Sequence, residues 1–112
     1  QPEDEFLPKR RMSAFYKTDL AQTLRTWKVD TVVVCGIMTH VCVLLSAMDA
    51  LQHDFRTVIV SDASACFKPE LHEQTLQLYD KFVLSPLFRI MTGDEIVTEM
   101  EDAWNSRQAQ AQ

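Results

Sequence analysis

A chain of 112 residues is long enough for one domain with a modest hydrophobic core. Its net charge of −5 and its lack of a basic stripe argue against nucleic-acid binding, and no apolar run approaches the about 18 residues of a membrane span. The cysteines at 35, 42 and 66 form neither a disulfide framework nor a CxxC metal motif, so we expect a reduced, cytoplasmic protein without a metal or other cofactor.

The first part of the chain predicts an extended segment followed by a helix. Pro8 disfavours helix in the residue before it, so we expect a short strand or an extended segment at residues 6–9. The basic run at residues 9–11 is by itself typical of a solvated surface. Thr18 or Asp19 can cap a helix that continues to about residue 28.

The stretch over residues 29–49 organises the rest of the chain. Residues 31–35 are an apolar, β-branched run that predicts a strand buried on both faces, and Gly36 ends the run. Apolar side chains then recur with helical spacing over residues 41–51, so we expect a strand, a tight turn and a helix. Cys42 falls in or near the first helical turn, where unpaired N–H groups and the helix dipole favour a thiolate.

The remaining segments continue the alternation of strand and helix. The sequence predicts strands over 56–61 and 87–91, a loop over 62–66, a helix from Pro69 to about residue 82, and a last helix from about residue 94. This alternation predicts an α/β fold with a parallel sheet. We expect one domain over residues 1–107 and a frayed tail over residues 108–112.

The cysteines differ in the chemistry they can support. Cys35 lies inside a predicted strand and is expected to be an inert, packed side chain. Cys66 lies in a loop at the carboxyl side of the sheet, where ligands often bind. A position outside the site is nevertheless the expected one for this cysteine. Cys42 is the candidate nucleophile, although a helical cysteine is more often a packing residue.

Three histidines and one aspartate are expected to stay outside the chemistry. His40 is a poor base for Cys42 because residues two apart on a helix do not face each other, so we place it at the rim of a pocket or on the surface. His53 and His72 are predicted at helix ends on the surface. Asp62 follows a strand and is expected to orient neighbouring loops through hydrogen bonds.

Three motifs, in this order, resemble those of the isochorismatase-like cysteine hydrolases. Residues 9–15 resemble K-x-R-x-S-A-F, residues 36–43 match G-x-x-T-x-x-C-V, and residues 58–63 resemble a strand that ends in D-A. The similarity spans about residues 5–100. It implies a Rossmann-like, three-layer α-β-α fold, of which this chain holds the C-terminal half.

The resemblance implies a catalytic triad of cysteine, lysine and aspartate. Cys42 would attack the carbonyl of a small amide or related substrate to form a thioester, and Lys9 would support the thiolate. The backbone N–H groups of Met38 and Cys42 would form the oxyanion hole, and the family places a cis peptide between Ile37 and Met38. The side chains expected around the substrate are Phe15, Ile37, Thr39 and His40.

The aspartate of the triad has no counterpart in the sequence. In the family it ends a first strand in D-x-Q, whereas Asp4 and Glu5 lie too close to Lys9. We therefore expect this chain to lack roughly the first half of the fold, with any metal ligands that half carries. The strand at residues 31–35 would then lack a neighbour and expose an apolar edge.

Two functions from different classes follow. The first is a cysteine hydrolase that is complete only with the missing half. This chain would then be a fragment or a processed chain, or its other half would be a separate polypeptide or come from another subunit. Its expected partners are a small-molecule substrate and further copies in a homo-oligomer, without nucleic acid or membrane. The second is a catalytically silent fragment or family member that serves as an assembly or binding module. The presence of Lys9, Gly36, Thr39 and Cys42 favours the hydrolase, because a silent module needs none of them chemically.

Overall fold

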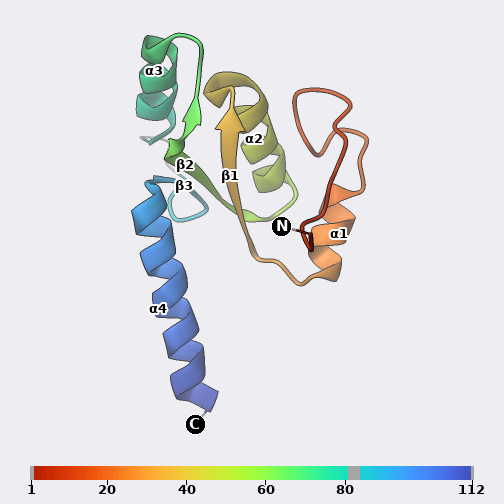
Figure 1. The fold of residues 1–112 in the computed structure, drawn as a ribbon, viewed down its shortest axis with the longest axis vertical. Coiled ribbons are helices and arrows are strands. Elements are labelled where there is room, and N and C mark those ends of the chain that lie inside the picture. The colour runs from red at the N-terminus through yellow and green to blue at the C-terminus, as the bar shows by residue number, and fades with distance from the viewer. Residues whose placement is uncertain (1, 81–83, 112) are drawn as a thin grey trace.

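A parallel sheet of three strands lies at the centre of the computed structural model, which describes residues 2–80 and 84–111 (Figure 1). The elements in chain order are α1 (Leu20–Thr26), β1 (Thr31–Ile37), η1 (Thr39–Val43), α2 (Leu44–Gln52), β2 (Arg56–Ala65), α3 (Pro69–Asp80), β3 (Phe88–Met91) and α4 (Gly93–Ala111). The predicted α/β class and parallel sheet are confirmed.

The strand order β1-β2-β3 puts β2 in the middle. Thr57, Val58 and Ile59 of β2 are each 0% exposed, so this strand is the one buried on both faces. Burial along β1 instead alternates, and Val33 is 42% exposed. The prediction of a doubly buried strand at residues 31–35 is therefore wrong, because β1 pairs with β2 on one side and lies at the edge of the described sheet.

Two hydrophobic clusters fix the helices that carry the site. Val43 and Ala47 of the helical segment pack with Ile59 and Phe88 of the sheet, and α3 contributes partly buried side chains to the same cluster. Complete burial of a side chain such as Ile59 is worth about 1.5–3 kcal/mol. In the second cluster, Phe15, Ala50 and Phe55 pack with Leu20 and Leu24 of α1.

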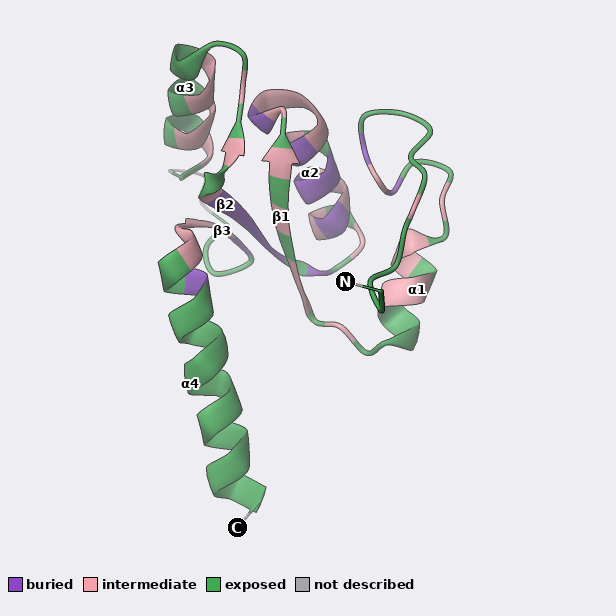
Figure 2. Cartoon of the chain, in the orientation of Figure 1, coloured by how far each residue is buried: buried purple, intermediate pink, exposed green. Residues whose placement is uncertain are grey.

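Helix α4 begins on the face of the sheet opposite α2 and α3. Side chains alternate along a strand, so Arg89 points away from Phe88, and its guanidinium lies 2.9 Å from Glu99 of α4. Ile96 is buried, but the rest of the helix projects beyond the sheet and is exposed (Figure 2). It continues through residues 108–111. Within the described ranges, no helix combines the length and apolarity that crossing a bilayer requires.

Residues 6–9 form no strand, so of the two forms expected there the extended segment remains. Two predicted boundaries differ from the structure. Strand β1 continues through Gly36, whose φ of +123° coincides with a shift in register against β2. Strand β2 extends across residues 62–65, which were expected to be a loop, because Gly36 and Ile37 continue to pair with it. Helix α3 ends at Asp80, and residues 81 and 82 of the predicted helix lie outside the described residues.

Candidate active site

Cys42 lies in a single π-helical turn, η1, between β1 and α2. The N–H of Val43 donates to the carbonyl of Met38 at 3.2 Å, which is the five-residue spacing of a π-helix. Such turns occur frequently at functional sites. The Ile37–Met38 peptide is cis, which confirms the prediction made for this bond. The turn therefore carries the cysteine at the start of a helix, directly after the end of β1.

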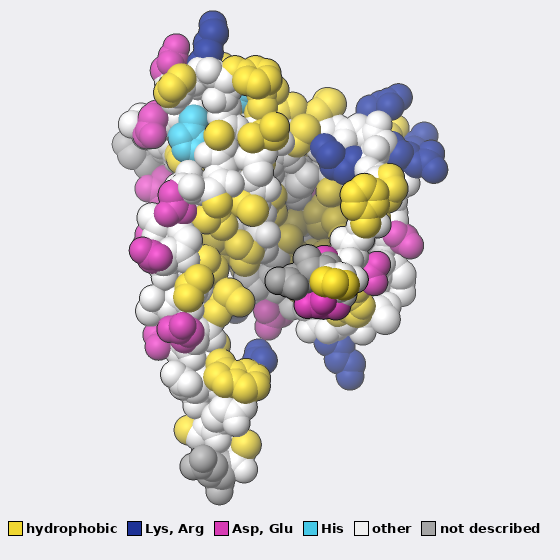
Figure 3. All heavy atoms as spheres, in the orientation of Figure 1, with side chains coloured by type: hydrophobic (Ala, Val, Ile, Leu, Met, Phe, Trp, Pro, Cys, Tyr) yellow, Lys and Arg dark blue, Asp and Glu magenta, His cyan; other side chains and the backbone are white. Residues whose placement is uncertain are grey.

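Cys42 and Lys9 line one cavity of about 320 Å³. Its lining residues are Lys9, Ala14, Phe15, Leu20, Val32, Val33, Val34, Cys35, Ile37, Cys42, Val43 and Ser46. The set is mostly apolar, and among the described residues that line the cavity Lys9 is the cation and no carboxylate is present. Figure 3 shows apolar side chains gathered in the hollow between the N-terminal segment and the sheet. The ammonium of Lys9 donates to the carbonyl of Met12 at 2.9 Å.

Residues 13–15 connect the loop that carries Lys9 to α2 through hydrogen bonds and packing. The N–H of Ala14 donates to Ser46 Oγ at 2.9 Å, and the N–H of Phe15 donates to Ser13 Oγ at 3.1 Å. The Phe15 ring is buried and stacks on His53, with the ring centroids 5.4 Å apart. His53 is the C-cap of α2, as predicted for a helix end, and this stacking leaves its ring only partly exposed. These contacts place the loop that carries Lys9 beside the helix that follows Cys42.

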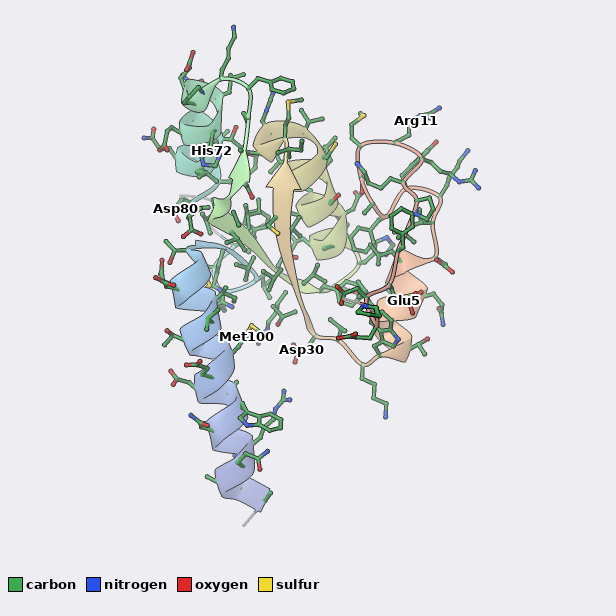
Figure 4. The ribbon with its side chains drawn as sticks, viewed as in Figure 1. Glu5, Arg11, Asp30, His72, Asp80 and Met100 are labelled. Carbon is green, nitrogen blue, oxygen red and sulfur yellow. The ribbon has the colours of Figure 1, made fainter. Side chains whose placement is uncertain are left out.

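Thr39 holds the turn from inside rather than lining the cavity. Its side chain is 0% exposed, and Thr39 Oγ1 lies 2.7 Å from Nδ1 of His72 on α3. Figure 4 shows His72 on the side of α3 that faces β2. His72 lies in the first turn of α3, as predicted for a helix end, and this hydrogen bond leaves its ring only partly exposed. Thr39 was expected beside the substrate, and its side chain is placed instead between η1 and α3.

The side chain of His40 contacts Cys66 rather than Cys42. Nδ1 of His40 lies 3.2 Å from Sγ of Cys66, which directly follows β2. Neither residue lines the cavity that contains Cys42, although His40 was expected at its rim. Sequence reasoning missed this pair. The available signal was that both residues follow parallel strands, whose carboxyl ends meet at one edge of a sheet.

The prediction for Cys35 is wrong, whereas the prediction for Asp62 is confirmed. Cys35 is exposed and lines the cavity, so the expectation of a packed side chain is wrong. The reason is that β1 lies at the edge of the described sheet and turns this side chain away from the covered face. Asp62 accepts a hydrogen bond from the N–H of Gly93 at 2.7 Å, which confirms its predicted orienting role.

The described residues place the candidate nucleophile Cys42 and the cation Lys9 on one cavity, while the backbone N–H groups of Met38 and Cys42 stay predicted oxyanion donors. Over residues 2–80 and 84–111, no three His, Cys, Asp or Glu side chains gather into a group that could hold a metal ion. The arrangement of Cys42 and Lys9 around an apolar cavity suits attack by sulfur on a small, mostly apolar carbonyl compound.

Comparison with known proteins identifies relatives for most of this chain. A family model described as the Isochorismatase domain matches residues 1–87. The phenazine biosynthesis protein PhzD of Pseudomonas fluorescens is 37% identical over 97 residues, which cover 87% of this chain and 45% of that protein. The maleamate amidohydrolase of Pseudomonas putida is 43% identical over 70 residues, which cover 62% of this chain and 33% of that protein.

The fold is also similar to that of a solved isochorismatase-like structure. The crystal structure of an isochorismatase-like hydrolase from Alkaliphilus metalliredigens aligns with a TM-score of 0.79 and 35% identity. The alignment covers 89% of this chain and 53% of that one. The chain thus spans about half the length of the protein of known structure, and 45% of the length of PhzD.

Proposed function

This chain belongs to the isochorismatase family, and from that premise we propose that it carries the nucleophile of a cysteine hydrolase. The substrate class is a small amide or a related compound with a cleavable C–N bond. The observation that carries the proposal is the position of Cys42 in the first turn of a helix, in one cavity with Lys9. The similarity to a maleamate amidohydrolase supports the choice of an amide.

In the proposed reaction, Cys42 acts as a thiolate. Its sulfur attacks the carbonyl carbon of the substrate, and the carbonyl oxygen becomes an oxyanion. The backbone N–H groups of Met38 and Cys42 donate to that oxyanion, because preorganised backbone donors stabilise charge that develops in the transition state. The amine then leaves with a proton, and water hydrolyses the remaining thioester to the acid. Lys9 stabilises the thiolate before the attack.

The proposed mechanism also needs a base to take the thiol proton. An ammonium such as that of Lys9 has no free electron pair, and the described lining of the cavity contains no carboxylate. We therefore assign the base to an aspartate on polypeptide outside the printed sequence, either covalently continuous with it or from another subunit. The intact mass of the native protein, together with a search for a companion chain, separates these sources.

The experiment that tests the nucleophile is cysteine labelling of the assembled protein. Iodoacetamide is added at neutral pH, and each cysteine is followed by peptide mass spectrometry. Cys42 is expected to react faster than Cys35, which is exposed but lies within a strand. Lys9→Met is expected to slow Cys42 by roughly three- to tenfold, because a nearby cation favours the thiolate and Lys9 is partly screened by water.

The matched control is Arg11→Met, which removes a neighbouring exposed charge that does not line the cavity. It should change the Cys42 rate less than twofold. Equal effects of the two variants, or a Cys35 rate as high as that of Cys42, would overturn the assignment.

The second candidate is an assembly module without catalysis, and one observation favours it. Val33 and Ile37 of β1 are 42% and 68% exposed, and Trp104 of α4 is 61% exposed. Large apolar surfaces of this kind often mark contacts with other proteins. A module of this kind would assemble equally well with Cys42→Ser and with Lys9→Met, and the assembled protein would hydrolyse no amide substrate.

A further inference from the structure

A second cysteine–histidine pair lies outside the cavity that holds Cys42. His40 stands in η1, and Cys66 directly follows β2, so 26 residues separate them in sequence. The distance from His40 Nδ1 to Cys66 Sγ is 3.2 Å, within the range of a hydrogen bond to sulfur. The fold therefore brings together a thiol and a base that the proposed hydrolase does not use.

The surroundings of this pair suit a reactive thiol more than a packed one. Both side chains are half-buried, so solvent solutes reach the sulfur while the contact remains partly shielded from water. The next residue, Phe67, is 88% exposed and does not cover the site. Fully buried cysteines are inert, whereas partly exposed cysteines beside a histidine exchange a proton with it and react as thiolates. Among the described residues no third metal ligand joins the pair, so a metal site is not supported.

We propose that Cys66 and His40 form a second reactive-thiol site, at which hydrogen peroxide or a similarly small hydroperoxide oxidises Cys66. Nδ1 of His40 takes the proton from the thiol, and the thiolate attacks one peroxide oxygen. The O–O bond breaks as the S–O bond forms, and the imidazolium gives its proton to the departing hydroxide. The products are a sulfenic acid at Cys66 and one molecule of water. Sulfur loses two electrons, and the peroxide gains them.

This inference goes beyond the proposed hydrolase and does not depend on it. Its test uses a Cys42→Ser background, in which the proposed nucleophile is absent. The full chain in its native assembly is treated with hydrogen peroxide in the presence of dimedone, which traps sulfenic acids. Peptide mass spectrometry then gives the rate of adduct formation at Cys66. His40→Gln is expected to lower this rate at least about tenfold at neutral pH, because it removes the positioned base that accepts the thiol proton.

Two control variants separate the role of His40 from general effects. His53→Gln removes a histidine that stacks on Phe15 in another part of the fold, and it should leave the Cys66 rate unchanged. Lys68→Met removes an exposed charge two residues from Cys66, and its effect should stay below twofold. At alkaline pH, where ordinary cysteines are ionised, iodoacetamide should label Cys66 equally in His40→Gln and its parent. This last comparison shows that the variant keeps the thiol accessible.

Several outcomes would overturn the proposal. One is an unchanged Cys66 rate in His40→Gln. Another is an equal loss of rate in Lys68→Met, which would assign the effect to general positive charge. A difference in alkaline labelling as large as the difference at neutral pH would assign it to accessibility. In each case the proposed role of Cys42 would be unaffected.

Discussion

The hydrogen bond between Thr39 and His72 is expected to hold the η1 turn against α3, and Thr39→Val tests this. Thr39 is 0% exposed, and its Oγ1 lies 2.7 Å from Nδ1 of His72. Valine has nearly the same volume as threonine, so the substitution removes the hydroxyl without opening a cavity. What changes is the hydrogen bond and the solvation of the groups that made it.

The expected loss of stability follows from the burial of the two partners. A typical hydrogen bond contributes about 0.5–1.5 kcal/mol, and a buried group left without a partner adds a cost of about 1–3 kcal/mol. The His72 ring is half-buried, so water replaces part of the lost interaction. We therefore expect Thr39→Val to lower the free energy of unfolding by about 1–2 kcal/mol.

Urea denaturation of the assembled protein measures this change as a shift in midpoint at constant slope. A double-mutant cycle with His72→Phe should give a coupling energy of at least about 0.5 kcal/mol, because the two side chains contact each other. The control is Thr57→Val, since Thr57 is also 0% exposed but its hydroxyl donates to the carbonyl of Phe55. Its coupling to His72→Phe should be near zero. A Thr39→Val variant as stable as the parent would refute the reasoning.

Three further predictions concern the backbone and the surface. Gly36→Ala should lower the free energy of unfolding by about 1–3 kcal/mol, because the φ of Gly36 is +123°. The added Cβ would meet nothing within 4 Å, so backbone strain alone is tested. The control Gly93→Ala, whose Cβ would lie 3.4 Å from Asp62 Oδ1, should be near neutral in the same urea assay. Asp62→Ala should cost about 1 kcal/mol by removing the acceptor of the Gly93 N–H, and Asp62→Asn should recover most of that loss. Residues 1–112 expressed alone should elute as assemblies on size exclusion with light scattering, because Val33 and Trp104 are exposed; a monodisperse, cooperatively unfolding monomer would contradict this.

Local patterns in the sequence were sufficient for the type and order of the elements. Apolar runs located the three strands of the described residues, and Pro69 marked the first residue of α3. Asp54 follows α2 with a φ of +68°, a left-handed conformation that aspartate adopts more readily than most residues. These features depend on residues close together in the chain, which is why sequence reasoning could reach them.

The contacts of the η1 turn could not be predicted in the same way. The partners of Thr39 and His40 lie 33 and 26 residues away, on segments whose mutual arrangement the sequence leaves open. The prediction that Cys35 is packed was wrong for a related reason. An apolar run predicts burial on both faces only where other elements cover both faces, and β1 has a described neighbour on one side.

The two histidine contacts also bear on which group can act on Cys42. His72 is engaged by Thr39 and His40 by Cys66, so the described wall of the cavity beside Cys42 contains neither ring. The charged side chain there is that of Lys9, which can stabilise a thiolate but cannot accept the proton of a thiol. In the proposed hydrolase this chain therefore supplies the sulfur, the cation and the oxyanion donors. In that proposal we expect the base to approach Cys42 from the side of β1 that is unpaired in the described sheet, where Val33 and Ile37 are exposed.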